Sequence, residues 1–447
     1  MTVFERVRLV RWDPAAVSEP IDLLVGDDGR VAAAGPGLAA AHPEARKGGS
    51  GGLVSPGLVL GHTHFYSALA RGLRVDIAPS KDFAQQLDHL WWRLDRALDD
   101  ATTRWSGVAG AMDAAACGVT TVIDHHASPE WIDGSLSVLA EGIGEVGIRS
   151  VLCYETTDRN GEAGAKAGVR ENERFAEEAD TARMPRLLSG GAPLFAAMIG
   201  AHAPFTLEDE TLDALGALCK ASGRPMHVHV AEDKYDAVDS RARRRLDPLV
   251  RLDRHGCLPK DSIVAHGLWL SPEEIAMIDA RGAMLAHNAR SNMNNAVGYQ
   301  AALPSLRNWM LGTDGMGADV LEEFKFAFFR HKDAGGPLWP DAYLKALGRA
   351  GNFAARLLGV EALELVPGAP ADLVHWDYPS PTALGADNLA GHLAFGLSSR
   401  HVKSVMVGGR FVIENKVPAY DAEALAARCA EAGDRLWKRM TDMERKA

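Results

Sequence analysis

Between residues 57 and 314 the chain repeats one pattern: short apolar runs of β-like residues, with helical stretches between most of them. Eight such runs occur, at 57–62, 119–126, 149–155, 197–202, 225–232, 262–267, 283–288 and 308–314. Eight strand–helix units in series are typical of a (β/α)8 barrel, an α/β fold in which helices surround a parallel sheet. This repeat constrains the fold more than any other feature of the sequence.

Each predicted strand ends in side chains that can titrate or bind a metal. They are His62, Asp124, His125, His126, Glu155, His202, His229, Glu232, His266, His287, Asn288 and Asp314. The carboxyl ends of all strands of a (β/α)8 barrel meet at one face, where catalysis takes place. One histidine at a strand end is usually explained by a core hydrogen bond, but eight coincidences predict a functional site.

Two histidine pairs have a spacing that suits metal binding. His62 and His64 lie two residues apart in "GHTH", as do His227 and His229 in "HVH", and alternate residues of a strand point the same way. Asp314 lies at the tip of the last strand, in "GTDG". Imidazoles with a carboxylate suit Zn(II) or Fe(II) better than Ca(II) or Mg(II). An ion with an open coordination position would lower the pKa of a bound water toward neutrality.

The motifs "GHTH", "HVHVAE", "VAHG" and "GTDG", in this order and spacing, resemble the amidohydrolase superfamily. The resemblance covers nearly the whole chain. "HAP" at 202–204 and "SPGLVLGHTH" are similar to its branch of cytosine, guanine and triazine deaminases, the ATZ/TRZ-like enzymes. Segments such as "HNARSNMNNAVG" and "GTDGMGADV" most resemble the SsnA-type aminohydrolases within that branch.

The resemblance implies a role for each motif residue. It implies metal ligands at His62, His64, His229 and Asp314, and catalytic roles for Glu232 as proton shuttle, His266 as the group that orients hydroxide or substrate, and Asp314 as base. The fourth predicted strand, "AMIGAH", has no lysine, so the branch that bridges two metals with a carboxylated lysine is not matched. We therefore expect one divalent ion, Zn(II) first, with Fe(II) as the alternative.

The implied reaction is hydrolytic. Asp314 takes a proton from metal-bound water, the hydroxide attacks an sp² ring carbon, and Glu232 protonates first the ring nitrogen and then the leaving nitrogen. If the leaving nitrogen is exocyclic, a small purine, pterin, pyrimidine or triazine is deaminated. If it belongs to the ring, a cyclic amide of the imidazolone or hydantoin type opens. A catalytically silent binding protein is a third alternative, against which the complete ligand and acid–base set argues.

Five residues are candidates for substrate contact. The resemblance implies this role for His202. Arg71 could bind a substrate carboxylate or carbonyl, or pair with a core acid. His126 could reach the pocket from the second strand, and Trp92 could cover a flat ring, although core packing is the simpler interpretation of an aromatic residue here. Asn288 offers a neutral hydrogen bond, suited to a heterocycle or to loop stabilisation.

The two ends of the chain are read as short strands with turns. Neither end has enough strands to bury a face by itself, so we expect residues 1–56 and 366–420 to form one composite β-sandwich domain. Residues 57–365 would be the catalytic barrel inserted between them. Residues 421–447 are rich in Ala, Glu and Arg and predict a C-terminal helix.

Charge and cysteine content limit the partners and the compartment. Acidic residues outnumber basic ones 59 to 48, for a formal net charge of −11, which argues against binding to nucleic-acid backbones. The five cysteines include no C-x-x-C pair and indicate a reducing compartment. We find no signal peptide and no apolar run of membrane-spanning length. We expect a soluble cytoplasmic protein with a small heterocyclic substrate and no nucleic-acid or membrane partner. The resemblance implies a homo-oligomer, a dimer or larger.

Overall fold

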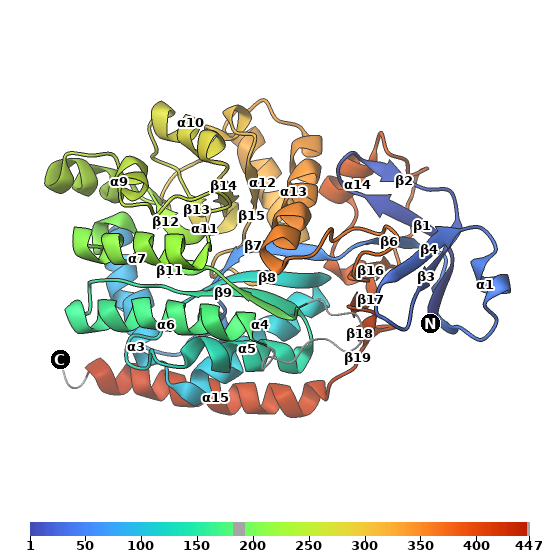
Figure 1. The fold of residues 1–447 in the computed structure, drawn as a ribbon, viewed down its shortest axis with the longest axis horizontal. Helices are drawn as coiled ribbons and strands as arrows, with labels where there is room; N and C mark the ends of the chain where they lie inside the picture. Colours follow the sequence, from blue (N-terminus) through green and yellow to red (C-terminus); the bar gives the residue numbers. More distant parts are fainter. Residues whose placement is uncertain (182–192, 445–447) are drawn as a thin grey trace.

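The computed structural model describes residues 1–181 and 193–444, and all eight predicted barrel strands form (Figure 1). They are β7 (Leu58–Thr63), β8 (Val119–His126), β9 (Arg149–Tyr154), β10 (Phe195–Ala197) with β11 (Ile199–Ala201), β12 (Met226–Val230), β13 (Ile263–His266), β14 (Met284–His287) and β15 (Trp309–Leu311). The fourth predicted strand is divided in two at Met198. The strands pair in parallel, as the (β/α)8 prediction requires.

The barrel strands form two sheets that meet along both sides. Their orders are β10–β9–β8–β7 and β11–β12–β13–β14–β15. On one side the chain runs from β10 through Met198 into β11. On the other side the backbone N–H groups of Thr313 and Asp314 donate to the carbonyl of His62, at 2.9 and 3.1 Å. The two sheets therefore curve into the barrel fold expected from the repeat.

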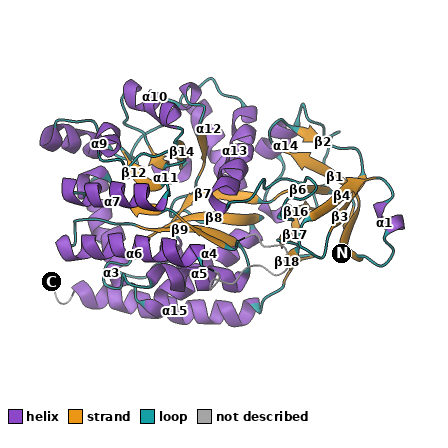
Figure 2. Ribbon diagram, in the orientation of Figure 1, coloured by secondary structure: helices purple, strands orange, loops and turns teal. Residues whose placement is uncertain are grey.

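Helices surround these strands (Figure 2). The longer helices are α4 (Asp100–Ala116), α5 (Ser135–Val146), α6 (Glu162–Asp180), α7 (Asp209–Ser222), α10 (Pro272–Arg281), α12 (Val320–Asp333) and α13 (Pro340–Leu358). The shorter helices are α8 (Lys234–Asp239), η4 (Ser240–Arg244), α9 (Pro248–Arg254), α11 (Ala289–Asn294) and α14 (Leu389–Phe395). Single helical turns occur at η3 (Pro204–Thr206), η5 (Leu303–Ser305) and η6 (Ser399–His401). Local sequence explains where they start. For example, α10 begins with Pro272 after a capping box between Ser271 and Glu274, and it ends at Gly282 with φ of 67°.

Alternate residues of the strands point into the barrel. Val59, Ile123 and Val151 are buried in one cluster with Phe353 of α13, while their sequence neighbours pack outward against the helices. The same parity continues along two of these strands. It brings His125 of β8 and Glu155, just after β9, to the same interior at the carboxyl end of the barrel.

Strands from both ends of the chain form one ten-stranded sheet, visible as blue and red strands side by side in Figure 1. They are β1 (Thr2–Arg11), β2 (Ala16–Val17), β3 (Ile21–Val25), β4 (Val31–Gly35), β5 (Arg46–Ser50), β6 (Leu53–Pro56), β16 (Leu373–Trp376), β17 (Val402–Val407), β18 (Arg410–Glu414) and β19 (Val417–Pro418), with the short helix α1 (Leu38–Ala41) before β5. β6 and β16 pair antiparallel, which joins the two ends. Phe4, Leu23, Leu373 and Met406 share one buried cluster. The domain boundaries at 56/57 and 365/366 stay a prediction.

The last helix, α15 (Ala422–Glu444), packs against the segment that follows β7 (Figure 1). That segment contains η1 (Phe65–Ala70), α2 (Phe83–Gln86), η2 (Leu87–Trp91) and α3 (Trp92–Ala97). The indole of Trp437 donates to the carbonyl of Leu69 at 2.9 Å, and the Arg93 side chain donates to the carbonyl of Met440 at 3.1 Å. The C-terminal helix thus anchors the segment between β7 and α4.

Within the described chain, no helix combines the length and the apolar character needed to cross a membrane.

Candidate active site

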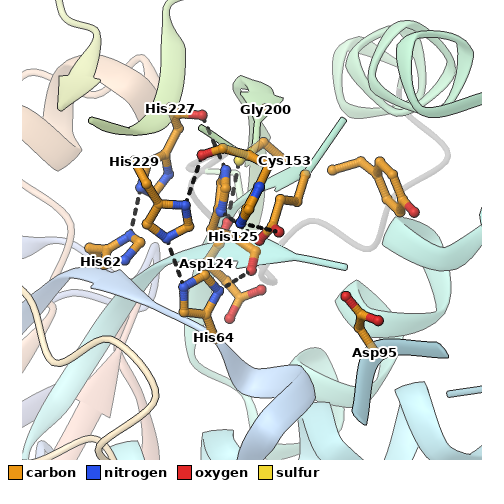
Figure 3. Close-up of polar contacts among 12 residues, drawn as sticks. His62, His64, Asp95, Asp124, His125, Cys153, Gly200, His227 and His229 are labelled. Atoms are coloured by element: carbon orange, nitrogen blue, oxygen red, sulfur yellow. Dashed lines mark hydrogen bonds and ion pairs between the residues drawn. The ribbon is translucent and has the colours of Figure 1, made fainter. Parts of the chain in front are cut away.

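The predicted metal ligands meet at the carboxyl end of the barrel, where Figure 3 shows His62, His64 and His229 turned toward one another. His64 Nε2 lies 3.0 Å from His229 Nε2 and 3.0 Å from Asp314 Oδ1. His62 Nε2 lies 3.7 Å from the same carboxylate oxygen. Ligand atoms of His62, His229, His266 and Asp314 all lie within 4.8 Å of one another. Side chains from four different strands are therefore close enough to share one ion.

The hydrogen bonds around this cluster orient the rings for metal binding. His64 Nδ1 faces the carbonyl of His125 at 2.6 Å, and His229 Nδ1 faces that of His202 at 2.9 Å. Each Nδ1 must therefore carry the hydrogen, which directs the Nε2 lone pair of the neutral ring to the centre. The Nε2 atom of His62 is buried there without a hydrogen-bond partner among the described residues. The donor set fits a divalent cation.

The electrostatics of the cluster favour a positive charge at its centre. Burial lowers the pKa of His62 to about 3 and holds that of His229 well below its usual range. Although burial opposes both effects, the contacts between Asp314 and the histidines keep the pKa of Asp314 well below its usual range and raise that of His64 to about 9. The carboxylate is thus anionic and attracts a cation, which a divalent metal ion would supply.

Glu232 and His266 lie beside the metal ligands. Glu232 Oε2 is 3.7 Å from His266 Nε2, and its other oxygen accepts a hydrogen bond from Asn295 at 3.4 Å. Burial raises the pKa of Glu232 to about 7, so its carboxyl group can both accept and donate a proton near neutrality. His266 Nδ1 bonds to Asn292 Oδ1 at 2.8 Å, which leaves Nε2 facing Glu232 and Asp314.

Three non-glycine residues at these strand tips have a left-handed backbone. The φ angles are 50° at Ala231, 69° at His266 and 53° at Asp314. Such conformations are unfavourable for residues with a Cβ atom and cluster at functional sites. Here they turn the chain sharply as it leaves β12 and β13 and just after β15. At these three positions the surrounding structure holds the backbone in an unfavourable conformation, and this conformation sets where the side chains lie.

A pocket opens from this cluster and is partly open to solvent. Its inner end is lined by His64, His229, Glu232 and Asp314. Aromatic and apolar side chains line much of the rest, among them Tyr66, Phe83, Leu87, Trp91, Trp92, Phe205 and Tyr235. A pocket of this composition suits a small organic ligand with a flat ring.

The five predicted substrate contacts fall into two groups. His202 and Trp92 line the pocket. Arg71 is not among the lining residues; its exposed guanidinium forms an ion pair with Asp113 at 2.9 Å. His126 is buried, with Nε2 3.0 Å from Ser128 Oγ, and Asn288 is buried with its amide 3.4 Å from His266 Nε2. Neither of these two side chains lines the pocket.

Sequence reasoning placed Glu155 at a strand end without assigning it a role, and it missed Asp95. Glu155 lies between two histidines, with carboxylate oxygens 3.2 Å from His125 Nδ1 and 3.5 Å from His202 Nε2. Its position at a strand end was the available signal. Asp95 lines the pocket and forms a buried ion pair with Arg159. No local pattern distinguishes Asp95, because it reaches the pocket from a segment between β7 and α4.

Polar residues of the seventh-strand loop bond to the predicted catalytic groups. Ser291 donates a hydrogen bond to Asp314 Oδ2, while Asn292 and Asn295 bond to His266 and Glu232. These contacts hold the catalytic side chains.

Comparison with known proteins adds sequence and structural relatives. A 5′-deoxyadenosine deaminase of Methanoregula boonei is 31% identical over 404 residues, covering 88% of this chain and 86% of that protein. A 5-methylthioadenosine/S-adenosylhomocysteine deaminase of Thermococcus sibiricus is 27% identical over 371 residues, covering 81% and 83%.

Two zinc-containing crystal structures share the fold. An adenosine deaminase of Xanthomonas campestris has a TM-score of 0.82 at 22% identity, covering 98% of both chains. The atrazine chlorohydrolase of Arthrobacter aurescens has a TM-score of 0.80 at 20% identity, covering 97% of this chain and all of that one, 100%. The sequence itself matches the amidohydrolase family over residues 53–412. Because this match spans most of the chain and includes every predicted metal ligand, the protein belongs to the amidohydrolase family.

Proposed function

We propose that the protein is a metal-dependent aminohydrolase, a hydrolase of carbon–nitrogen bonds other than peptide bonds, which deaminates a small nitrogen heterocycle. One observation carries the proposal: four potential metal ligands, a carboxyl group of raised pKa and a histidine converge at the inner end of an aromatic pocket. The related proteins named as deaminases of adenosine derivatives support the same reaction. Adenine nucleosides altered at the 5′ position are therefore the first substrates to test.

We assign the metal to His62, His64, His229 and Asp314, with Zn(II) as the proposed ion and Fe(II) as the alternative. A bound ion would supply a hydroxide nucleophile at neutral pH by lowering the pKa of water. The buried, unpartnered Nε2 of His62 and the converging Nε2 atoms of His64 and His229 support this assignment.

The remaining chemistry falls to the protein side chains. Asp314 accepts one proton from the attacking water through Oδ2, the oxygen nearer His266. Glu232 donates a proton to the ring nitrogen beside the attacked carbon, then takes up the proton of the new hydroxyl group and delivers it to the departing amino group. The proton held by Asp314 returns to Glu232 through solvent, which restores both side chains for the next turnover. His266 Nε2 stabilises the charge that develops on the new oxygen. Water and the amino heterocycle are thereby converted into the oxo heterocycle and ammonia.

The test is a substrate panel with two separate assays. Metal-loaded protein is incubated with 5′-deoxyadenosine, methylthioadenosine, adenosine, guanine, cytosine, a pterin, an aminotriazine and a hydantoin, and both ammonia and new carboxylate are measured. Ammonia without carboxylate is the expected result. Carboxylate without ammonia would favour the ring-opening alternative, and a metal content near zero under every growth supplement would favour a silent binding protein.

The variant Glu232→Gln tests the assigned proton shuttle. It should lower kcat/KM by about 10³-fold while the metal content stays the same, because the amide cannot carry a proton. Asn295→Ala, which removes only a hydrogen bond to Glu232, is the matched control and should lose far less activity.

We also propose a cytoplasmic homo-oligomer. All five cysteines are free thiols, as is usual in a reducing compartment. Light scattering of the purified protein measures the number of subunits directly.

A further inference from the structure

A row of aromatic rings leads from the inner end of the pocket to its mouth. The ring centroids of His229 and His202 are 5.7 Å apart, those of His202 and Phe205 are 5.8 Å apart, and those of Phe205 and Tyr235 are 5.5 Å apart. Tyr235 is 50% exposed, whereas His229 is buried. The row thus defines an outward direction, from the metal-binding end toward solvent.

Apart from histidines and tyrosines, the ionisable side chains that line this pocket are acids. Six carboxylates line it, at Asp95, Glu155, Glu232, Asp233, Asp236 and Asp314, and the described lining residues include no lysine or arginine. The guanidinium of Arg159 lies close by, but it forms an ion pair with Asp95 and lies over the Trp92 ring at 5.0 Å. Lys234 lies over the ring of Trp269, at 5.9 Å.

Most of these carboxylates already have partners. Glu155 contacts two histidines, and Glu232 and Asp314 belong to the catalytic centre. Asp236 is buried and accepts hydrogen bonds from the backbone N–H groups of Ala231 and Phe205, at 2.7 and 3.1 Å. These four acids, with the paired Asp95, are therefore engaged within the protein.

Asp233 differs from the other acids. It precedes α8 and accepts one hydrogen bond, from the N–H of Tyr235 at 2.8 Å. Across the described chain it forms no ion pair with a lysine, arginine or histidine. It stands next in sequence to Glu232 and two residues before Tyr235, the exposed end of the ring row. A carboxylate with spare acceptor capacity thus shares the pocket lining with the aromatic side chains of Phe205 and Tyr235.

Aromatic faces combined with a carboxylate bind organic cations, because both attract positive charge. A phosphate or carboxylate in the same place would be repelled by the acids and would find no cationic partner among the described lining residues. We propose that the outer end of the pocket binds a positively charged group of the substrate, an ammonium, amidinium or guanidinium remote from the reacting carbon, and that Asp233 is the residue that selects it. This inference rests on the proposed function for the position of the reacting carbon.

The first experiment measures binding, so it needs no turnover. Benzamidine, benzamide and benzoate share one ring and carry a positive, a neutral and a negative group. Their dissociation constants for the metal-loaded protein are measured by calorimetry and by the fluorescence of Trp91 and Trp92, which line the pocket. Benzamidine should bind about tenfold more tightly than benzamide, and benzoate should bind most weakly.

Two variants assign the preference to a residue. Asp233→Asn should reduce the benzamidine-to-benzamide affinity ratio from about ten to about one. Asp333→Asn makes the same charge change on α12, outside the pocket, and should preserve the ratio. Equal binding of the three probes, or equal effects of the two variants, would overturn the inference.

Turnover then separates this inference from the proposed function. The same charge series is built on one nucleoside: 5′-amino-5′-deoxyadenosine, 5′-deoxyadenosine and adenosine 5′-monophosphate. We expect kcat/KM to fall in that order. If none releases ammonia and the panel heterocycles are also unchanged, the proposed function fails while the affinity ratio still decides the role of Asp233. Ammonia release at equal rates from all three would refute the charge preference and leave the proposed function standing.

Discussion

The two ends of the pocket are built by different parts of the fold. At the inner end, His62, His229 and Asp314 lie at or just beyond the tips of β7, β12 and β15, and the register of parallel strands sets their positions. At the outer end, residues such as Trp91 and Tyr235 belong to segments between strands. The comparison indicates that the proposed chemistry is attached to the barrel strands, whereas the proposed ligand selection depends on packing among the short helices and loops between them.

The two ends nevertheless touch. A Cβ atom placed on Gly315, the residue after Asp314, would lie 2.3 Å from the Trp91 ring. Trp91 therefore packs directly against the turn that carries a proposed metal ligand. Variants at each end, and variants beside the pocket, can show how independent the two ends are.

The largest effect should come from the inner end. Asp314→Asn removes the anionic ligand and base, so we expect kcat/KM to fall about 10⁴-fold with loss of bound metal. Activity and metal content are measured on the same sample, and thermal unfolding verifies the fold. Asp113→Asn, at a surface ion pair, is the control. Activity within tenfold of wild type would contradict the assigned role of Asp314.

An outer-end variant should act on binding more than on chemistry. Trp91→Ala removes a ring that lines the pocket, so KM should rise about tenfold while kcat changes little. Trp339→Ala, at an exposed tryptophan that does not line the pocket, is the control. If kcat falls as much as KM rises, the contact at Gly315 couples the ends, and the comparison drawn above must be revised.

A buried strand-end residue outside the pocket should affect stability with a distinct pH dependence. Burial lowers the pKa of His126 to about 3, so the ring stays neutral in the folded protein. In the unfolded chain the same ring is protonated below about pH 6.5. His126 therefore destabilises the fold as the pH falls. The difference in unfolding free energy between wild type and His126→Gln should narrow by about 1 kcal/mol from pH 7 to 5.5. Urea denaturation at both pH values measures it, and a constant difference would argue against a buried neutral ring.

The smallest effect should come from Arg71, which lies outside the lining residues. Its exposed ion pair with Asp113 contributes at most about 1 kcal/mol, so Arg71→Ala should lower stability slightly and change kcat/KM less than about twofold. Steady-state kinetics with the best substrate of the panel provides the measurement. A tenfold rise in KM would instead restore Arg71 as a substrate contact and extend the outer end beyond the described lining.

Much of the barrel and of the inner end could be predicted from the sequence. All eight strands were located from their apolar runs, and "GHTH", "HVHVAE" and "GTDG" place their residues at strand tips. Such local patterns suffice because strand parity decides which side chains point inward and the barrel brings all strand tips to one face. The roles assigned to those residues stay proposals until the variants are made.

Beyond Trp92 and His202, sequence patterns did not locate the outer end. Trp91 and Asp95 enter the pocket through a segment that α15 holds in place, and the contact between Trp437 and Leu69 joins residues 368 positions apart. Glu155 gains its two histidine partners only when three strands come together. Arg71 and His126, though close in sequence to the motifs, turn to partners outside the pocket.

The sequence by itself thus determined the barrel and the convergence of histidines and acids at its carboxyl end, because a periodic pattern carries its own geometry. Only the tertiary structure decided which side chains line the rest of the pocket. It also decided that the carboxylates in this lining outnumber the lysines and arginines. These positions result from packing between segments far apart in the chain, and no local periodicity encodes such packing.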